Sequence, residues 1–181
     1  MTVPLSAISP DLLDLFAQFP PADDLPEYDF LDAYEVPPPY HDLLVHEHHM
    51  TVTVEAHHGD LVDVKVLEYR VADDSYARKI LLPLQRTRRV VMFGLMRVNF
   101  RYYSDEIRQE ILAGTVPLGR VLINHNVLRR IEPTAFLRVF PGPAMVEWFG
   151  LDAPRPTYGR FALIHCDEQP AVELLEIVRP E

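Results

Sequence analysis

Apolar and polar residues alternate along much of the chain, as they do in strands whose side chains point to two opposite faces. Residues 50–56 (MTVTVEA) and 61–71 (LVDVKVLEYRV) alternate on either side of His58-Gly59-Asp60, so we predict a hairpin there. Five further segments carry a strand pattern: residues 77–84, 88–100, 126–140 (which Pro133 interrupts), 158–166 and 170–178.

Helix signals lie before and between these strands. Ser9-Pro10 predicts the start of a short amphipathic helix, and Ser104 and Gly114 predict the two ends of a second one. Shorter helices are expected near residues 40–45 and 117–125. Helices inserted among runs of strands, without strict alternation of the two, indicate an α+β fold with an antiparallel sheet.

Length and composition fit one folded domain with an acidic arm. The 181 residues are 48% hydrophobic, and a single cysteine, Cys166, excludes an internal disulfide. No stretch approaches the ~20 apolar residues of a membrane span, so we expect a soluble, cytoplasmic protein. Residues 1–42, acidic and rich in proline, are predicted to lie as a helix and an extended arm over the body, residues 43–181.

Charge is divided unevenly along the chain. The net charge is −10, yet residues 1–64 hold thirteen Asp or Glu and no Lys or Arg, while the remainder holds all seventeen bases, fifteen of them arginine. The planar arginine fork suits carboxylates and phosphates. Either the acidic arm is simply solvated, or the arginines of the body serve a small anion. No nucleic-acid-reading signature is found, so no nucleic-acid partner is expected.

Charged side chains interrupt the apolar faces of predicted strands. Arg78 and Arg97 each share strand parity with apolar neighbours, and Glu173 and Glu176 point to opposite faces of the last strand. A buried arginine needs a carboxylate, which either the protein or a ligand can supply. A plain buried ion pair and an anion-binding site are both compatible with this pattern.

Five histidines between residues 46 and 58 suit a metal ion in principle, because His-x-His on a strand places two imidazoles on one face. However, HEHHM lacks the last histidine of HExxH, and Glu55 follows His48 by seven residues, which does not fit a cupin-like ligand set. Exposed hairpin histidines explain the segment more simply, and we assign no metal. The motifs GxGxxG, GxxxxGK[ST] and GxSxG are absent from the sequence.

Four motifs, in order from about residue 43 to 178, resemble those of the chorismate lyase family, which splits pyruvate from chorismate to give 4-hydroxybenzoate. LLVHEHHMT resembles the family's Leu-Leu…Met-Thr segment, and YARKILL its Arg-x-Ile/Val-Leu-Leu strand. TVPLGRVL resembles its Thr-Pro-Leu-Gly-Arg motif, and YGRFALIHCDEQPAVELLE its closing hairpin. The resemblance implies a six-stranded antiparallel sheet with inserted helices and an enclosed ligand cavity.

The resemblance also implies residue roles. The catalytic positions would be Glu176, and Arg78 as the arginine that holds the ring carboxylate. The substrate-binding positions would be Met50, Thr51, Leu118, Gly119, Arg97 and Arg160. Arg97 is included because this chain has Gly94-Leu95 where enterobacterial-type members have Gly-Arg. Lyase chemistry of this kind needs neither a metal nor an organic cofactor.

The function predicted on this basis is that of a cofactor-independent chorismate lyase whose partner is a small aromatic carboxylate. Two alternatives stay open. The same fold serves, without chemistry, as the ligand-sensing half of certain GntR-type regulators, although an acidic arm and no winged-helix segment precedes the domain here. The second alternative is a metal enzyme that uses the histidine cluster. The sequence does not predict an oligomeric state.

Overall fold

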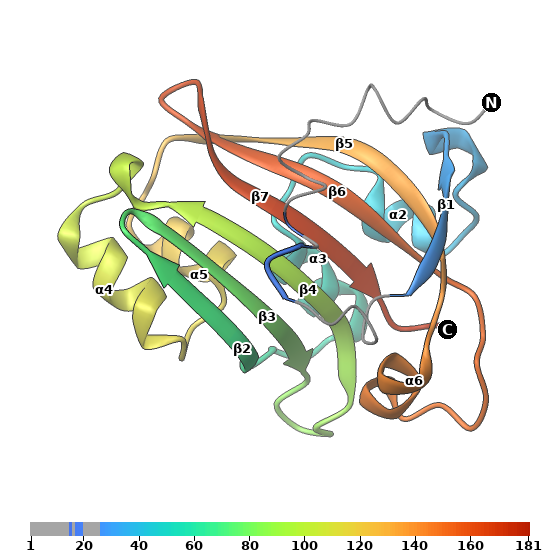
Figure 1. The fold of residues 1–181 in the computed structure, drawn as a ribbon. Coiled ribbons are helices and arrows are strands. Elements are labelled where there is room, and N and C mark those ends of the chain that lie inside the picture. Colours follow the sequence, from blue (N-terminus) through green and yellow to red (C-terminus); the bar gives the residue numbers. More distant parts are fainter. Residues whose placement is uncertain (1–14, 16, 20–25) are drawn as a thin grey trace.

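The computed structural model describes residues 15, 17–19 and 26–181, and the helix predicted from Ser9 lies largely outside them. The strands are β1 (Glu27–Leu31), β2 (Lys65–Ala72), β3 (Ser75–Pro83), β4 (Val90–Asn99), β5 (Arg129–Phe140), β6 (Thr157–Cys166) and β7 (Gln169–Val178). They form one antiparallel sheet in the order β1-β5-β6-β7-β4-β3-β2 (Figure 1).

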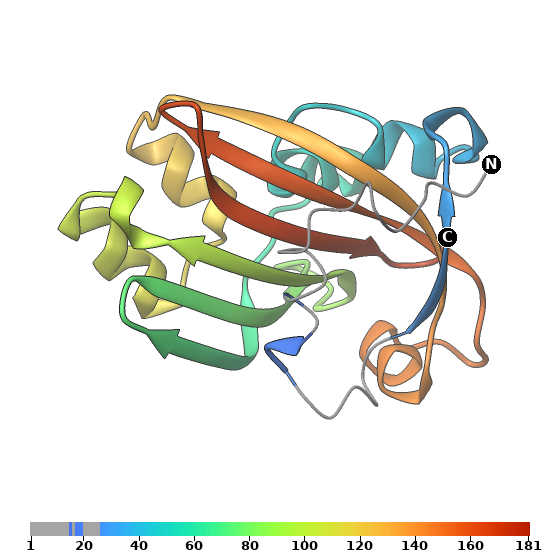
Figure 2. The same cartoon turned by 45° about the horizontal axis from the view of Figure 1, so that its top comes forward.

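Helices lie on both faces of this sheet. They are α2 (Tyr40–Leu44), α3 (Met50–His58), α4 (Asp105–Ala113), α5 (Leu118–Asn124) and α6 (Pro143–Phe149), with 3-10 turns at Ala33–Glu35 and Phe100–Tyr102. Residues of α2 to α5 pack on one face, which we call the helical face, while α6 packs on the other (Figures 1 and 2).

The alternation of side chains along each strand supplies both faces with a core. On the helical face, Ile80 and Met96 are buried among residues from α2 to α5. On the opposite face, Phe93 packs with Phe149 of α6 and with Phe19. Each of these fully buried side chains stabilises the fold by about 1.5–3 kcal/mol relative to its exposure to water.

The structure confirms the predicted α+β class and antiparallel sheet, but the sheet has seven strands instead of six. The additional strand is β1, which pairs with β5 at the edge of the sheet, with Tyr28 opposite Val139. Part of the predicted arm is therefore a strand of the sheet. The division of the chain after residue 42 stays a prediction.

The hairpin predicted across His58-Gly59-Asp60 is wrong in its first half. Residues 50–58 form helix α3. Its buried Met50 and Val54 lie four residues apart on one side of the helix, whereas Val52 is 43% exposed. Gly59 ends the helix with a φ of 59°, a left-handed conformation that glycine adopts without strain. Packing of this buried side of α3 against the sheet overrides the strand preference of the β-branched residues.

The remaining predicted elements are present close to their expected limits. Ser104 begins α4, since its side chain accepts a hydrogen bond from the Ile107 amide, and Gly114 ends it with a φ of 66°. Pro133 does not split its strand in two: β5 continues past it with a shift of register between Pro133 and Ala135. None of the described helices is long and apolar enough to cross a membrane.

Candidate functional site

A row of four residues crosses the middle of the helical face. Ile80 of β3 lies opposite Gly94 of β4, which lies opposite Glu176 of β7, and Glu176 in turn lies opposite Arg160 of β6. The strand register thus brings two charged residues into an otherwise apolar part of the core. Gly94 leaves the position between Ile80 and Glu176 without a side chain.

A small cavity of about 40 Å³ lies above this row. Its floor is formed by strand residues that include Ile80, Leu82, Met92, Gly94, Met96 and Glu176. Its cover is formed by His49, Met50 and Thr51 at the start of α3 and by Pro117, Leu118 and Gly119 at the start of α5. The lining is therefore apolar apart from Glu176 and a few groups of the cover.

The cover packs closely because Gly119 lacks a side chain. A Cβ at that position would lie 3.1 Å from Cβ of His49 and 3.1 Å from Oγ1 of Thr51. Arg120 of α5 also forms an ion pair with Glu55 of α3, which joins the two helices of the cover. The predicted positions Met50, Thr51, Leu118 and Gly119 are thus brought together at one place, over the cavity.

Glu176 is held from one side by Arg160. Nε of Arg160 donates to Oε2 of Glu176 at 2.7 Å, and the two side chains are almost completely buried. Burial raises the pKa of Glu176, while the Arg160 guanidinium lowers it in part. No described residue donates a side-chain hydrogen bond to Oε1 of Glu176.

Arg160 is occupied by the protein on its other donors. Nη1 donates to the carbonyl oxygens of Leu44 (3.1 Å) and His46 (2.8 Å), and Nη2 donates to that of His48 (3.1 Å). These carbonyl groups belong to the last residue of α2 and to the segment that joins α2 to α3. The predicted substrate-binding residue Arg160 is therefore next to the cavity as the anchor of Glu176 and of this segment.

Arg78 is fully buried on the helical face, two residues before Ile80 along β3. Its Nη1 donates to the carbonyl oxygen of Ile111 near the end of α4, at 3.4 Å. Its Nε and Nη2 have no hydrogen-bond partner among the described residues. Burial lowers the pKa of Arg78, and the nearby Tyr76 raises it in part. A buried cation with two unpaired donors is costly unless an anion meets it.

Arg78 and Glu176 lie on the same face, on strands β3 and β7, with β4 between them. Two strand spacings and two residue steps separate their Cα atoms, which corresponds to roughly 12 Å. Met96 and Leu174, which are in register with Arg78, line the cavity, whereas Arg78 itself lies beyond its present wall. The structure thus places a cation and an acid at two ends of one apolar region.

Arg97 does not belong to this region. It is in register with Glu173 of β7, forms an ion pair with it, and lies on the face opposite Arg78 and Glu176. Its strand parity is that of Phe93 and Leu95, which pack with α6 on that face. A plain ion pair, one of the two alternatives left open by the sequence, accounts for this arginine.

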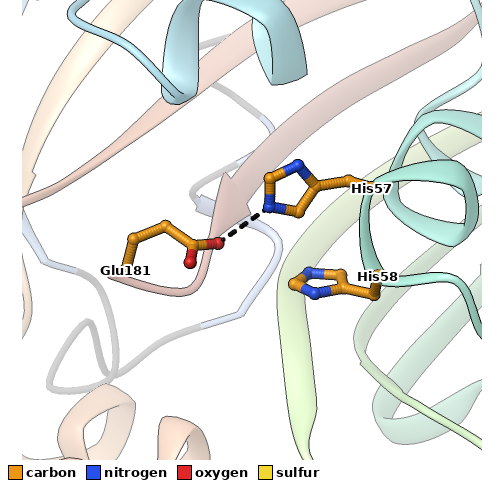
Figure 3. Close-up of side chains that lie close together, drawn as sticks. All are labelled: His57, His58 and Glu181. Carbon is orange, nitrogen blue, oxygen red and sulfur yellow. Dashed lines mark hydrogen bonds and ion pairs between the residues drawn. The ribbon is translucent and has the colours of Figure 1, made fainter.

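The histidines fall into two groups. His49 covers the cavity, and its pKa is lowered to about 4 by burial and by the nearby Arg129 and Arg160. At the other end of α3, His57, His58 and Glu181 bring three possible metal ligands within 4.8 Å of one another (Figure 3).

Positively charged arginines lie near the group formed by His57, His58 and Glu181. His57 Nε2 lies 3.1 Å from a Glu181 carboxylate oxygen, a distance that an ordinary hydrogen bond explains. Arg89 donates to Nδ1 of His58 at 3.4 Å. Burial lowers the pKa of that histidine, and Arg89 and Arg179 lower it further. The positive charges of Arg89 and Arg179 would repel a divalent cation at this position. We therefore place the functional site at the cavity instead.

Some lining residues had no place in the sequence prediction. They are His49, Ile80, Leu82, Met92, Gly94, Met96, Pro117, Ile164 and Leu174. Strand parity was a usable signal for some of them, since Ile80 and Leu82 share the parity of Arg78, and Leu174 that of Glu176. His49 lines the cavity only because α3 is a helix, which the sequence pattern did not predict.

No protein-family model and no curated protein matches the sequence. Solved structures do match. The effector domain of PhnF from Mycobacterium smegmatis is 12% identical, with a TM-score of 0.52 over 73% of this chain and 88% of that one. The longer PhnF chain from the same organism gives 12% identity and a TM-score of 0.51, over 72% of this chain and 63% of that one. The match therefore spans less than two thirds of PhnF.

The fold is chorismate lyase-like. A third match, at 12% identity and a TM-score of 0.46, is the ligand-binding domain of a protein described as a GntR-family transcriptional regulator from Bordetella bronchiseptica, over 65% of this chain and 85% of that one. At the level of the fold, the resemblance read from the sequence holds.

The predicted enzymatic activity is corrected by these comparisons. The PhnF structure that matches over most of its effector domain is named as an effector domain and not as a lyase. The motifs behind the prediction contain the residues around the cavity, and such residues serve a domain that only binds a ligand as well as one that transforms it. The comparisons also give no support to the expected absence of a nucleic-acid partner, because part of the PhnF chain lies outside the match.

Proposed function

We propose that this domain binds a small aromatic carboxylate, of the hydroxybenzoate type, without transforming it. The ligand carboxylate meets Arg78, the ring fills an enlarged form of the cavity, and a ring hydroxyl faces Glu176. The names of the matching structures, an effector domain and a ligand-binding domain, support a role in sensing.

The observation that carries this proposal is the pair of unpaired donors on Arg78. Nε and Nη2 lie on one edge of the guanidinium, and this edge can hold the two oxygens of a carboxylate in parallel. Neither Glu176 nor Glu173 is available to Arg78, because these carboxylates pair with Arg160 and Arg97. An anionic ligand would satisfy a charge that no described carboxylate satisfies.

The other end of the region suits a hydroxyl group. Glu176 keeps Oε2 on Arg160, which leaves Oε1 to accept a hydrogen bond from a ligand. The roughly 12 Å between the two strand positions leaves room for one aromatic ring with a polar group at each end. The walls between them, which include Ile80, Met96 and Leu174, are apolar and suit the faces of a ring.

Calorimetric titration of the wild-type protein with 4-hydroxybenzoate and with 4-hydroxybenzamide tests the proposal. The two ligands have nearly the same shape, and only the first is an anion. We expect the acid to bind at least about tenfold more tightly, because its charge-assisted bonds to Arg78 are worth roughly 1.5–3 kcal/mol. Equal affinities, or no heat with either ligand, would contradict it.

Incubation with chorismate supplies a second test. A domain that only binds its ligand releases no pyruvate above the rate in buffer, although chorismate, as a carboxylate, competes with 4-hydroxybenzoate for the site. Protein-dependent pyruvate release that the substitution Glu176→Gln abolishes would contradict the non-catalytic role.

A further inference from the structure

Arg160 connects the floor of the cavity to the segment that leads into its cover. One donor, Nε, holds Glu176 on the floor, and Nη1 and Nη2 hold the backbone carbonyl groups of residues 44, 46 and 48. The chain then continues directly into His49, Met50 and Thr51, which cover the cavity. A single buried guanidinium thus fixes both the acid and the cover relative to each other.

The cavity is too small for an aromatic ring as it stands. It encloses about 40 Å³, whereas a dry apolar cavity that binds benzene has a volume of about 150 Å³. The floor cannot yield easily, because β3, β4, β7 and β6 are paired along their length. The cover consists of helix ends and loops, so it is the part that must move outward when a ring is bound.

Outward movement of the cover acts against Arg160. The backbone between α2 and α3 forms few hydrogen bonds of its own, such as the one from the Val45 amide to the His41 carbonyl group. Its carbonyl groups instead converge on the guanidinium, which Glu176 in turn holds in place. Displacement of the cover therefore lengthens these bonds, and a ligand hydroxyl that bonds to Glu176 weakens the hold of that acid on Arg160.

We propose that Arg160 is a positioning residue that makes the segment of residues 44–49 respond to occupancy of the cavity. Without ligand, the Glu176–Arg160 pair keeps the segment ordered and the cover closed. With ligand, the segment is released and the start of α3 moves away from the sheet. This inference rests on the proposed function and adds the element through which binding changes the conformation of the domain.

Hydrogen exchange followed by mass spectrometry on the full chain tests this coupling, read on a peptide that spans residues 41–50. The variants are Glu176→Gln and, as the matched control, Glu173→Gln, which makes the same chemical change on the same strand but on the opposite face. In the absence of ligand, Glu176→Gln should speed exchange in this peptide about tenfold, the effect of losing one charge-assisted hydrogen bond. Glu173→Gln should leave it unchanged.

The ligand arm uses 4-hydroxybenzoate at a concentration that saturates each protein, wild type or variant, by calorimetry. Binding should speed exchange in the peptide several-fold in the wild type and in Glu173→Gln, and should add little in Glu176→Gln, where the segment is already released. Arg160→Lys, which keeps the charge but not the planar fork, should behave like Glu176→Gln. Circular dichroism verifies that each variant is folded.

The two levels of the proposal fail in different ways. If 4-hydroxybenzoate binds but leaves exchange of residues 41–50 unchanged, the coupling is wrong and the proposed function stands. If the ligand does not bind, the proposed function is wrong, and the ligand-free comparison still decides whether Glu176 acts through Arg160. Equal exchange in Glu176→Gln and Glu173→Gln without ligand overturns the role of Arg160.

Discussion

Arg160 and Glu176 lie opposite each other on adjacent strands, and their side chains meet at 2.7 Å in the interior of the protein. Arg78 is equally buried but has no carboxylate among the described residues. Two buried arginines on one face of a sheet thus have opposite situations. The first is paired with a carboxylate of the protein, whereas none of the described residues supplies a carboxylate to the second.

The unpaired donors of Arg78 predict that its replacement stabilises the ligand-free protein. Arg78→Met replaces a buried, partly unpaired charge by an apolar side chain of similar length. We expect the ligand-free protein to become about 1–4 kcal/mol more stable, because such replacements remove a desolvation cost. Urea unfolding measures this change. A destabilised Arg78→Met protein would show that the described residues satisfy Arg78 after all.

Gly94 predicts an effect of cavity volume. A Cβ at this position would lie 3.2 Å from Cγ1 of Ile80 and 3.5 Å from Cε of Met92, at the floor of the cavity. Gly94→Ala should weaken binding of 4-hydroxybenzoate about tenfold while the fold is kept, since small overpacking costs about 1–3 kcal/mol. Calorimetry and circular dichroism on the same sample measure both. Unchanged affinity would place the ring elsewhere.

The buried histidine of the cover predicts acid sensitivity. The pKa of His49 is lowered to about 4 in the folded protein, whereas that of an unfolded histidine is about 6.5. Between these values the unfolded state binds more protons, so stability falls as the pH drops from about 6.5 towards 4. The loss attributable to His49 is at most about 3–4 kcal/mol, at 1.36 kcal/mol per pKa unit.

Urea unfolding at pH 7 and at pH 4.5 measures this loss. His49→Gln keeps an acceptor for the N–H group that Arg129 donates to the imidazole, but it does not titrate in this range. We therefore expect a smaller difference between the two pH values in His49→Gln than in the wild type. Equal differences in the two proteins would show that His49 is not responsible.

Glu176 predicts a preference for ligands with a ring hydroxyl. We expect 4-hydroxybenzoate to bind about tenfold more tightly than benzoate to the wild type, because the hydroxyl donates to a buried carboxylate. In Glu176→Gln the acceptor is neutral, so this preference should shrink. Calorimetric titration of both ligands into both proteins measures it, and an undiminished preference in Glu176→Gln would mean that another group receives the hydroxyl.

The sequence predicted the charged part of the site better than its shape. Strand parity placed Arg78 on an apolar face and separated Glu173 from Glu176, because the period of a strand is fixed by backbone geometry. It could not show which partner each charge meets, since pairing depends on the register between strands that are distant in the sequence. Arg160, for example, meets Glu176 through the β6–β7 register.

The cover was harder to predict from the sequence. Residues 50–56 alternate like a strand, and only packing against the sheet makes them the helix α3. Without that helix, neither the position of His49 nor the close approach of Gly119 can be foreseen. The activity was beyond reach for a different reason: a binding domain and a lyase of one fold share the residues that hold a ligand, so motifs around a cavity do not separate the two.

The most direct test of the account combines one change in the ligand with one change in the protein. The affinities of 4-hydroxybenzoate and 4-hydroxybenzamide are measured by calorimetry for the wild type and for Arg78→Met. If the carboxylate meets Arg78, the preference for the acid, at least about tenfold in the wild type, disappears in Arg78→Met. An equal preference in both proteins would contradict the account, because the ligand carboxylate would then be held by another group.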